Sequence, residues 1–377
     1  MTVLDELIQE LCPDGVKYKA LGEICKLVTG ATPSKTNAAY WENGTIPWMS
    51  SGEVNLKRVT ATEKKITQLG YEKNSTTIVP KHSVVIALAG QGKTRGKAAI
   101  TEIELCTNQS LCSMICNENL DYKFLYYILD GKYEELRAIS NGDGTRGGLS
   151  LKILAPYKIP VPPLPVQREI VRILDNFTEL TAELTAELTA RKQQYAYYRD
   201  KLLAFGDDEP KDTLENLCDF QYGKGNSIPT VPGEYPVYGC NGVVGTTNVF
   251  NSIDAPVIGH IGSAGIVNWG KGKHFVTYNG TICKVRPEKM IPRYAYHLLC
   301  SLHLERFVKG SQPFLSYSDF AKETVAVPPL NIQQRVVSIL DCFDTLCTDL
   351  FSGLPAEIEA RQKQYEYYRN KLLDFEQ

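Results

Sequence analysis

The sequence predicts an α/β protein with a pseudo-twofold internal repeat, in which two similar globular domains are separated by two long antiparallel helices that pair as a coiled coil. Three observations lead to this fold class. One segment occurs twice, as VPPLPVQREIVRILDNFTEL at 161–180 and as VPPLNIQQRVVSILDCFDTL at 327–346. A second reads RKQQYAYYRDKLLAF at 191–205 and RQKQYEYYRNKLLDF at 361–375. Apolar residues recur every three or four positions through these blocks, as in an amphipathic helix.

The first repeated helix is predicted over 166–205. Prolines at 162–165 end the preceding segment and are tolerated where a helix begins. A helix of that length spans about 60 Å at ~1.5 Å per residue. Its single apolar stripe needs a partner, and the other copy supplies one. The second helix is expected to be interrupted at Ser352-Gly353-Leu354-Pro355, which has no counterpart in the first.

The segments before the helices also repeat, more faintly. LGEICKLVTG at 21–30 matches LENLCDFQYG at 214–223, and both globular segments are rich in Gly, Thr, Val, Tyr and short alternating runs. That composition is typical of short strands joined by long loops. The expected domains are a globular domain at 1–160, a helix at 161–206, a globular domain at 207–326 and a helix at 327–377. Near-identical helices indicate one fixed partner, whereas divergent globular domains indicate two different targets.

Composition excludes several classes of protein. The chain has 377 residues, 43% hydrophobic and 22% charged, which is ordinary for a globular protein. It has no run of ~18 apolar residues for a membrane helix and no signal-peptide pattern at its start, so we expect a cytoplasmic protein that binds no membrane. Eleven cysteines without a C-x-x-C motif favour neither a disulfide framework nor a zinc site. The net charge of −2 means that any surface for an anion is built locally, from loops.

Glycine-rich basic loops are the candidate DNA-binding elements. The string from Ala87 to Thr94 matches a relaxed phosphate-loop pattern, but Arg95-Gly96-Lys97 is a poor start for the helix that such a loop needs. We therefore favour a loop that presents its basic and polar side chains to phosphates and base edges, against the simpler alternative of a solvated turn. The candidate DNA-binding residues of this and the similar loops are Lys93, Thr94, Arg95, Lys97, Arg146, Lys224, Asn226, Lys271, Lys273 and His274.

The repeated helices carry candidate partner-binding residues near their ends. Tyrosines at a spacing of three form a packing face, whereas the tyrosine between them and the neighbouring cations are available to a protein partner. These candidates are Tyr197, Arg199 and Lys201 in the first copy and Tyr367, Arg369 and Lys371 in the second. The sequence holds no G-x-S-x-G, no methyltransferase N-P-P-[FY] motif and no nuclease cluster, so we expect no catalytic residue and no metal site.

With these motifs the chain resembles the specificity subunit of type I restriction-modification systems. The resemblance rests on the twin P-P-L-x-x-Q…I-L-D-x-F…Y-x-Y-Y-R-x-K-L-L-x-F helices and the Thr-Ala-Glu-Leu repeat at 181–188. It implies that each globular domain is a target recognition domain reading one half of a bipartite, asymmetric double-stranded DNA site. It also implies that the helices space these domains and dock two modification (methyltransferase) subunits, with restriction (translocase and nuclease) subunits in the full complex.

The resemblance also implies that S-adenosylmethionine, ATP and Mg²⁺ belong to the partner subunits, with no cofactor in this chain. Two alternatives remain open at this point. One is a stand-alone DNA-binding regulator, which would need no methyltransferase partner. The other is a P-loop ATPase, which would bind ATP as an isolated chain.

Overall fold

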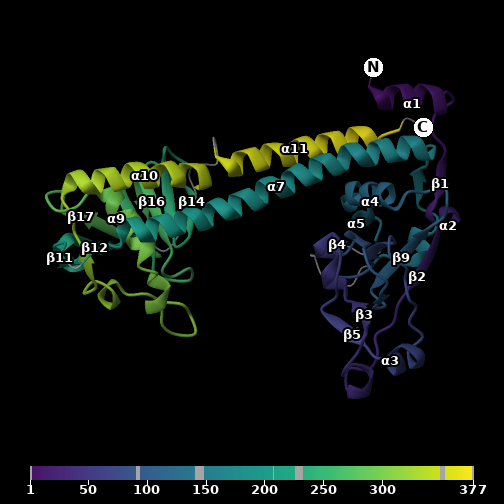
Figure 1. Ribbon diagram of the computed structural model, residues 1–377, viewed down its shortest axis with the longest axis horizontal. Helices are drawn as coiled ribbons and strands as arrows, with labels where there is room; N and C mark the ends of the chain where they lie inside the picture. Colours follow the sequence, from purple (N-terminus) through teal and green to yellow (C-terminus); the bar gives the residue numbers. More distant parts are fainter. Residues whose placement is uncertain are drawn as a thin grey trace. The chain divides into compact units, whose positions relative to one another are not determined.

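Two compact units make up the protein. The computed structural model describes residues 2–90, 94–140, 148–206, 208–225, 232–348 and 353–375. Unit 1 comprises residues 1–182 together with 359–377, and unit 2 comprises 183–358. Figure 1 follows the elements of each unit along the chain. The compact units cut through both repeated helices, whereas the four domains predicted above follow chain order and stay a prediction.

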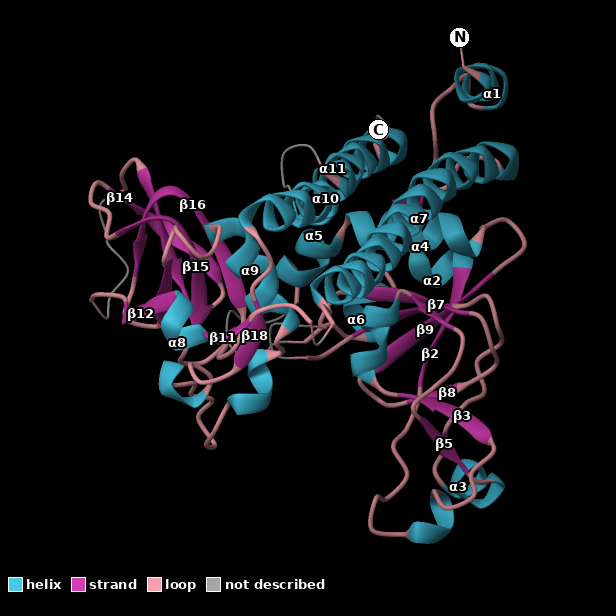
Figure 2. Cartoon of the chain, turned by 60° about the vertical axis from the view of Figure 1, so that its left-hand side comes forward, coloured by secondary structure: helices cyan, strands magenta, loops and turns pink. Residues whose placement is uncertain are grey.

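Unit 1 is built on a five-stranded sheet in the order β2-β9-β6-β7-β4. Its strands are β2 (Cys25–Thr29), β4 (Arg58–Val59), β6 (Val84–Ala87), β7 (Ala98–Thr101) and β9 (Leu111–Cys116). They pair antiparallel except for β4, which runs parallel to β7. β6 and β7 are buried along their whole length, as expected for central strands of valine, isoleucine and alanine. The helix α4 (Tyr122–Gly131) packs on them (Figure 2).

A second, smaller sheet in unit 1 has the order β5-β3-β8 and lies at the end of the unit away from α7 (Figures 1 and 2). Its strands are β3 (Ile46–Met49), β5 (Lys64–Ile66) and β8 (Cys106–Thr107), flanked by η1 (Ala38–Tyr40), η2 (Ser51–Leu56) and α3 (Gln68–Lys73). The remaining elements are α1 (Val3–Leu11), β1 (Tyr18–Ala20), α2 (Leu21–Ile24), α5 (Tyr133–Ala138), α6 (Leu151–Leu154) and β10 (Lys158–Pro160). β1 pairs antiparallel with β10.

Unit 2 is built on a six-stranded sheet in the order β12-β17-β15-β16-β13-β14. Its strands are β12 (Cys218–Tyr222), β13 (Tyr235–Gly239), β14 (Gly242–Thr247), β15 (Ser252–Gly259), β16 (Val267–Val276) and β17 (Gly280–Val285). The other elements are β11 (Lys211–Thr213), α8 (Leu214–Leu217), α9 (Pro292–Ser301), η3 (Leu304–Phe307), η4 (Tyr317–Asp319) and β18 (Thr324–Ala326), with β11 antiparallel to β18.

The faint repeat between the globular segments is confirmed by the two folds. LGEICKLVTG forms α2 and β2, and LENLCDFQYG forms α8 and β12. The glycine that ends each string is explained by a close backbone contact. A Cβ on Gly30 would lie 1.7 Å from the carbonyl oxygen of Thr107, and one on Gly223 would lie 2.1 Å from that of Thr277. Both units therefore need glycine at the same place, where two backbone segments touch.

The long helices form in the segments where the apolar periodicity predicted them. α7 (Leu164–Leu203) has 40 residues, two positions earlier at each end than predicted. The second copy forms α10 (Leu330–Thr348) and α11 (Leu354–Leu373). Of the predicted interruption at 352–355, Ser352 lies outside the described residues, and Gly353 is non-helical directly before α11 begins. Pro355 occupies the first turn of α11, where its missing N–H costs nothing.

Each unit holds parts of both repeated helices. Unit 1 contains the first half of α7 and most of α11, and unit 2 contains the second half of α7 and α10 (Figure 1). In unit 1 Phe177 stacks on Tyr368 at 5.3 Å, and in unit 2 Phe343 stacks on Tyr198 at 5.7 Å, both with an interplanar angle of 20°. Figure 1 shows that α10 and the second half of α7 run in opposite directions in unit 2.

Candidate nucleic-acid interface

The four predicted DNA-binding residues of the loop after β6 do not share one environment. Thr94 is buried, and its hydroxyl donates to the carbonyl of Ala89 at 3.2 Å. This corrects its assignment as a DNA contact, because the side chain closes the turn instead. Lys97 is half-buried with its Nζ 2.8 Å from Asn55 Oδ1, and Arg95 is also half-buried. Both stay candidates, and Lys93 lies outside the described residues.

The same loop argues against the ATPase alternative. Among the described residues, Thr94–Gly96 form a turn and β7 begins at Ala98. A phosphate loop instead delivers its Lys-Thr pair into the N-terminus of a helix, whose N–H groups hold the phosphate. A strand at this place supplies no such cradle.

Basic side chains in unit 2 lie along one strand and one loop. Lys271 and Lys273 on β16 are exposed, and so is Lys224 after β12. The Nζ of Lys273 lies 5.0 Å from the ring centroid of Phe250 and 5.8 Å from that of Tyr235. These contacts hold one cation between the exposed ring of Phe250 and the half-buried ring of Tyr235, a combination suited to phosphate and base contact. Arg146 and Asn226, the other two loop candidates, lie outside the described residues.

His274 does not belong to this basic surface. Its side chain is fully buried, with Nδ1 2.9 Å from the carbonyl oxygen of Gly272. A Cβ on Gly270 would lie 2.3 Å from its Nε2, so the imidazole occupies the space that this glycine leaves free. Burial lowers the pKa of His274. A neutral, enclosed imidazole offers DNA no contact, which corrects the prediction at this residue.

Sequence reasoning missed a basic groove in the small sheet of unit 1. The groove has a volume of about 530 Å³, and its lining includes Lys35, Lys64, Lys65, Trp41 and Glu42. All three lysines are exposed, and the indole N–H of Trp41 donates to a backbone carbonyl at 3.0 Å, which fixes the ring. Three cations against one carboxylate favour an anionic ligand such as a phosphate backbone. The sequence pointed to glycine-rich loops, whereas the segments that carry these three lysines are not rich in glycine.

The repeated helices present matching exposed tyrosines. Tyr197 and Tyr367 are each 61% exposed, and each packs edge-to-face on the tyrosine that follows it. Lys201 and Lys371 are also exposed, and the Nζ of Lys201 lies 5.9 Å from the Tyr197 ring centroid. These four candidates are therefore available to a partner.

The two arginines of the same motif are turned inward. Arg199 is buried, pairs with Asp200 at 2.9 Å and lies over the Tyr195 ring. Arg369 pairs with Asp130 at 2.7 Å, and its side chain is 15% exposed. The burial of Arg199 argues against its assignment as a partner-binding residue. Arg369 is partly buried and paired with the globular part of its unit, and it stays a candidate.

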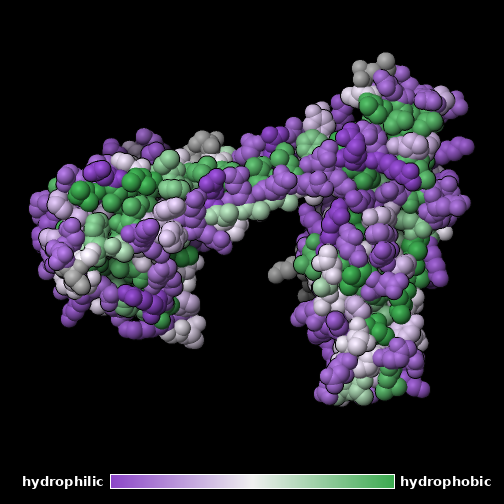
Figure 3. Space-filling model, in the orientation of Figure 1, coloured by the Kyte–Doolittle hydropathy of each residue, from purple (hydrophilic) through white to green (hydrophobic). Residues whose placement is uncertain are grey.

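Apolar side chains on the helices add to the candidate partner surface. Ile339 and Leu346 on α10 are 46% and 38% exposed, and Figure 3 shows apolar side chains along this helix. Leu180 on α7, the repeat counterpart of Leu346, is 36% exposed. Exposed leucine or isoleucine one or two turns apart on a helix is typical of a protein interface. The repeat had suggested only coiled-coil packing for these positions.

Within the described residues we find no cluster of three or more His, Cys, Asp or Glu side chains placed to hold a metal ion. Nor does any helix there combine the length and apolar character needed to cross a membrane.

The fold and these surfaces define a duplicated binding protein. Its two units have the same core fold, each with its own core, they differ in their loops, and each contains parts of both repeated helices. The family model for the type I restriction modification DNA specificity domain matches this chain twice, at residues 13–191 and 213–360. The chain therefore belongs to the family of type I restriction-modification specificity subunits, whose role is DNA recognition.

Individual relatives agree with this assignment. The Escherichia coli type I restriction enzyme EcoprrI specificity subunit is 32% identical over 369 residues, covering 89% of each chain. The putative type I specificity subunit S.MpnORF201P of Mycoplasma pneumoniae is 35% identical over 253 residues, 59% of this chain and 98% of that protein. The crystal structure of the S subunit from M. genitalium matches 95% of this chain and 96% of its own with a TM-score of 0.61 at 18% identity, which shows a shared fold.

Proposed function

We propose that unit 1 and unit 2 each read one half of a bipartite, asymmetric double-stranded DNA site. The observation that carries this proposal is the contrast between the shared core and the different additions to it. The strand order β2-β9-β6 recurs as β12-β17-β15, with α4 and α9 in matching places. Both units also carry an antiparallel strand pair, β3 with β5 and β13 with β14, whose first strand pairs parallel with the segment just before β9 or β17. Unit 1 adds η2, β4 and α3 between β3 and β6, whereas unit 2 runs from β13 through β14 to β15 without such elements. One scaffold with two different attachments suits two different half-sites.

The basic surfaces of the units are the proposed DNA contacts. The chain has a net charge of −2, so its attraction to phosphate is local. In unit 1 the groove with Lys35, Lys64 and Lys65 supplies it, and in unit 2 the exposed lysines Lys271 and Lys273 of β16 do so. Such lysines provide affinity, whereas base readout falls to neighbouring side chains in the loops.

The repeated helices are the proposed docking sites for two methyltransferase subunits. Exposed side chains that recur in both copies include Tyr197 with Tyr367, Lys201 with Lys371 and Leu180 with Leu346. Two equal surfaces on one chain bind two copies of one partner. In this proposal the methyltransferase and restriction subunits of the full complex hold S-adenosylmethionine, ATP and Mg²⁺ and perform all catalysis, while this chain supplies none.

The continuous helix α7 is proposed to set the distance between the half-sites. The Thr-Ala-Glu-Leu repeat at 181–188 lies inside it. Four residues are close to one helical turn and about 6 Å, so one more unit keeps the apolar face and shifts the ends by one to two base pairs at ~3.4 Å each.

A domain exchange tests the proposed division of labour. Residues 1–160 are replaced by another recognition domain of the family, the chain is assembled with its methyltransferase subunits, and the methylated sites are mapped. We expect one half-site to change while the other stays. A change in both halves or in neither would contradict the proposal. Full site recognition by the chain without any methyltransferase subunit would favour a stand-alone regulator.

A further inference from the structure

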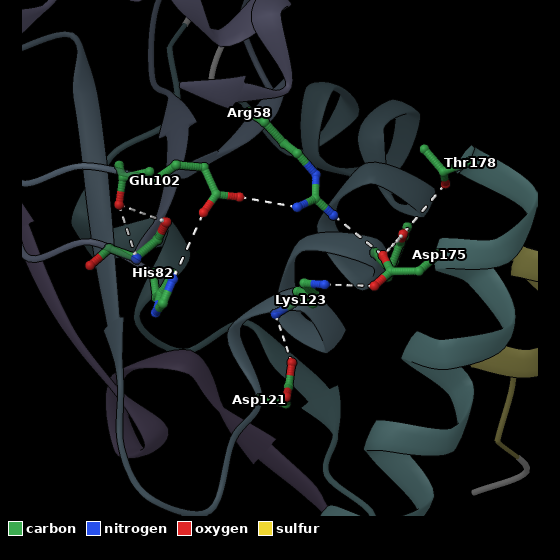
Figure 4. A network of polar contacts seen from close by, with 10 residues as sticks. Arg58, His82, Glu102, Asp121, Lys123, Asp175 and Thr178 are labelled. Carbon is green, nitrogen blue, oxygen red and sulfur yellow. Dashed lines mark hydrogen bonds and ion pairs between the residues drawn. The ribbon is translucent and has the colours of Figure 1, made fainter. Parts of the chain in front are cut away.

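Asp175 on α7 is the point where three elements of unit 1 meet. Its carboxylate accepts a hydrogen bond from Lys123 Nζ of α4 at 2.6 Å (Figure 4). It accepts another from Tyr127 Oη of the same helix, also at 2.6 Å. Arg58 of β4 reaches it from the sheet, with Nη2 at 3.4 Å, while the other end of that guanidinium pairs with Glu102 at 3.0 Å. The Asp175 side chain is 16% exposed. This Asp175 network ties the sheet and its covering helix to one residue of α7.

Unit 2 has a counterpart built from different partners. Asp341 on α10 accepts from Arg293 Nε at 2.7 Å and lies 2.8 Å from His297 Nε2, both on α9. His297 Nδ1 in turn lies 2.9 Å from the hydroxyl of Tyr195 on α7. The Arg293 guanidinium lies 5.0 Å from the ring centroid of Trp269 on β16. This Asp341 network also joins the sheet, its covering helix and the repeated helices.

The two networks occupy the same place in the repeat. Asp175 and Asp341 are the aspartates of ILDNF and ILDCF, and Lys123 and Arg293 occupy the same turn of α4 and α9. The acid on the helix is the same in both units, whereas the groups that meet it from the globular side differ.

Such networks control orientation in a way that apolar packing does not. Burial of apolar surface is non-directional and lets a helix roll or slide on its neighbour at low cost. Charge-assisted hydrogen bonds are directional and short. Because partners of Asp175 come from both α4 and β4, the network opposes rotation of the sheet about the axis of α7. On α10, Asp341 holds α9 through Arg293 and His297, and Arg293 carries the link on to the sheet by stacking on Trp269 of β16.

We propose that Asp175 and Asp341 are positioning residues for spacing: they hold each globular part at one angle on its helix, and thereby narrow the range of half-site spacings that the protein accepts. The inference rests on the proposed function, since it concerns the two half-sites and the distance between them. In this proposal the two networks determine how far the spacing can depart from its preferred value. The preferred spacing itself is set by the length of α7.

The test compares three variants of the chain, each assembled with its methyltransferase subunits. Arg58→Ala removes the tie from the sheet, and Asp175→Asn removes the charge of the network. Arg172→Ala is the control, because Arg172 is exposed and pairs at 2.6 Å with Glu169 on the same helix. Methylation is measured on a library with fixed half-sites and spacers one or two base pairs shorter or longer than the optimum.

We expect Arg58→Ala and Asp175→Asn to raise methylation at spacers one base pair away from the optimum by about tenfold relative to the optimum, equivalent to ~1.4 kcal/mol. The preferred half-site bases should not change, and Arg172→Ala should match the unaltered chain. A network that served stability alone would lower all rates together and leave the spacer profile unchanged. Arg58 is 44% exposed, so Arg58→Ala decides the matter if Asp175→Asn fails to fold.

An insertion of Thr-Ala-Glu-Leu after Leu188 separates this inference from the proposed function. If the insertion moves the optimum by about one base pair while Arg58→Ala leaves the profile as narrow as before, the positioning role is overturned and the spacing role of α7 stands. If the insertion leaves the optimum in place, the spacing role itself fails.

Discussion

Gln167 and Gln333 make the same three hydrogen bonds in the two units, and both side chains are fully buried. The side-chain oxygen of Gln167 accepts from the backbone N–H of Asp121 at 2.8 Å. Its amide nitrogen donates to the backbone carbonyls of Asn119 and Pro162 at 2.9 and 2.7 Å. One side chain thus ties the start of α7 to the segment that leads into α4, which explains the glutamine of the P-P-L-x-x-Q motif.

Replacing the second glutamine should destabilise unit 2. Gln333 accepts from the N–H of Ile291 at 2.9 Å and donates to the carbonyls of Lys289 and Pro328. Gln333→Ala leaves these buried groups without their partner, so we expect a loss of about 2–4 kcal/mol in the free energy of unfolding. Denaturant titration measures it. Gln334→Ala, at the exposed neighbouring position, is the control and should stay within about 0.5 kcal/mol.

Alanine at Gly30 should be far more disruptive than alanine at an open glycine. The added Cβ would lie 1.7 Å from the carbonyl oxygen of Thr107, so β2 or its neighbour must move. We expect unit 1 to lose about 3–5 kcal/mol. Gly52→Ala is the matched control, since the nearest atom to its Cβ is Ser50 Oγ at 3.9 Å. Equal thermal midpoints for the two variants would show that the strands adapt to the extra methyl group.

Acidification should destabilise unit 2 more than unit 1. Burial lowers the pKa of His260, His274 and His297. In the unfolded chain a histidine takes up a proton near pH 6.5, and these folded sites do not. Their contribution to stability is therefore complete above pH 6.5 and is lost as the pH falls below it, at up to ~1.4 kcal/mol per pH unit for each group. Hydrogen exchange at pH 7.5 and 5.5 measures this in both units, and unit 1, whose histidine His82 is exposed, is the internal control.

The lysine groove of unit 1 should contribute through phosphate contacts. Alanine at Lys35, Lys64 and Lys65 together should weaken binding to target and random DNA alike. The slope of log K against log salt should fall by about 2–3, since each phosphate contact adds ~0.9. Lys132→Ala is the control, because that lysine pairs with Glu135 at 3.2 Å beside α4. A slope that stays the same in the triple variant would remove this groove from the DNA interface.

The local sequence pattern was sufficient to predict the long helices, but it was not sufficient to predict which side chains form the candidate binding surfaces. Apolar spacing, the prolines before α7 and the Gly-Leu-Pro break depend on neighbours in sequence, and all of them are seen in the structure. His274 and Arg199 look like surface residues in sequence because glycines or charged residues surround them. His274 fills the space that Gly270 leaves on β16, and Arg199 is buried on α7. Which face of each element is covered depends on the packing of the folded unit, and sequence spacing does not give it. The lysine groove joins 35–42 with 64–65, and these segments meet through the pairing of β3 with β5.

The division of the chain into units sets an order for folding during synthesis. Unit 2 is one continuous stretch, 183–358, whereas the core of unit 1 includes Tyr365 and packs against Leu372. A ribosome that has released all of unit 2 still holds the segment that completes unit 1. The part made first is therefore finished last, and in the nascent unit 1 the face of α7 around Phe177, which stacks on Tyr368 of α11, stays exposed to chaperones or to aggregation until α11 is made.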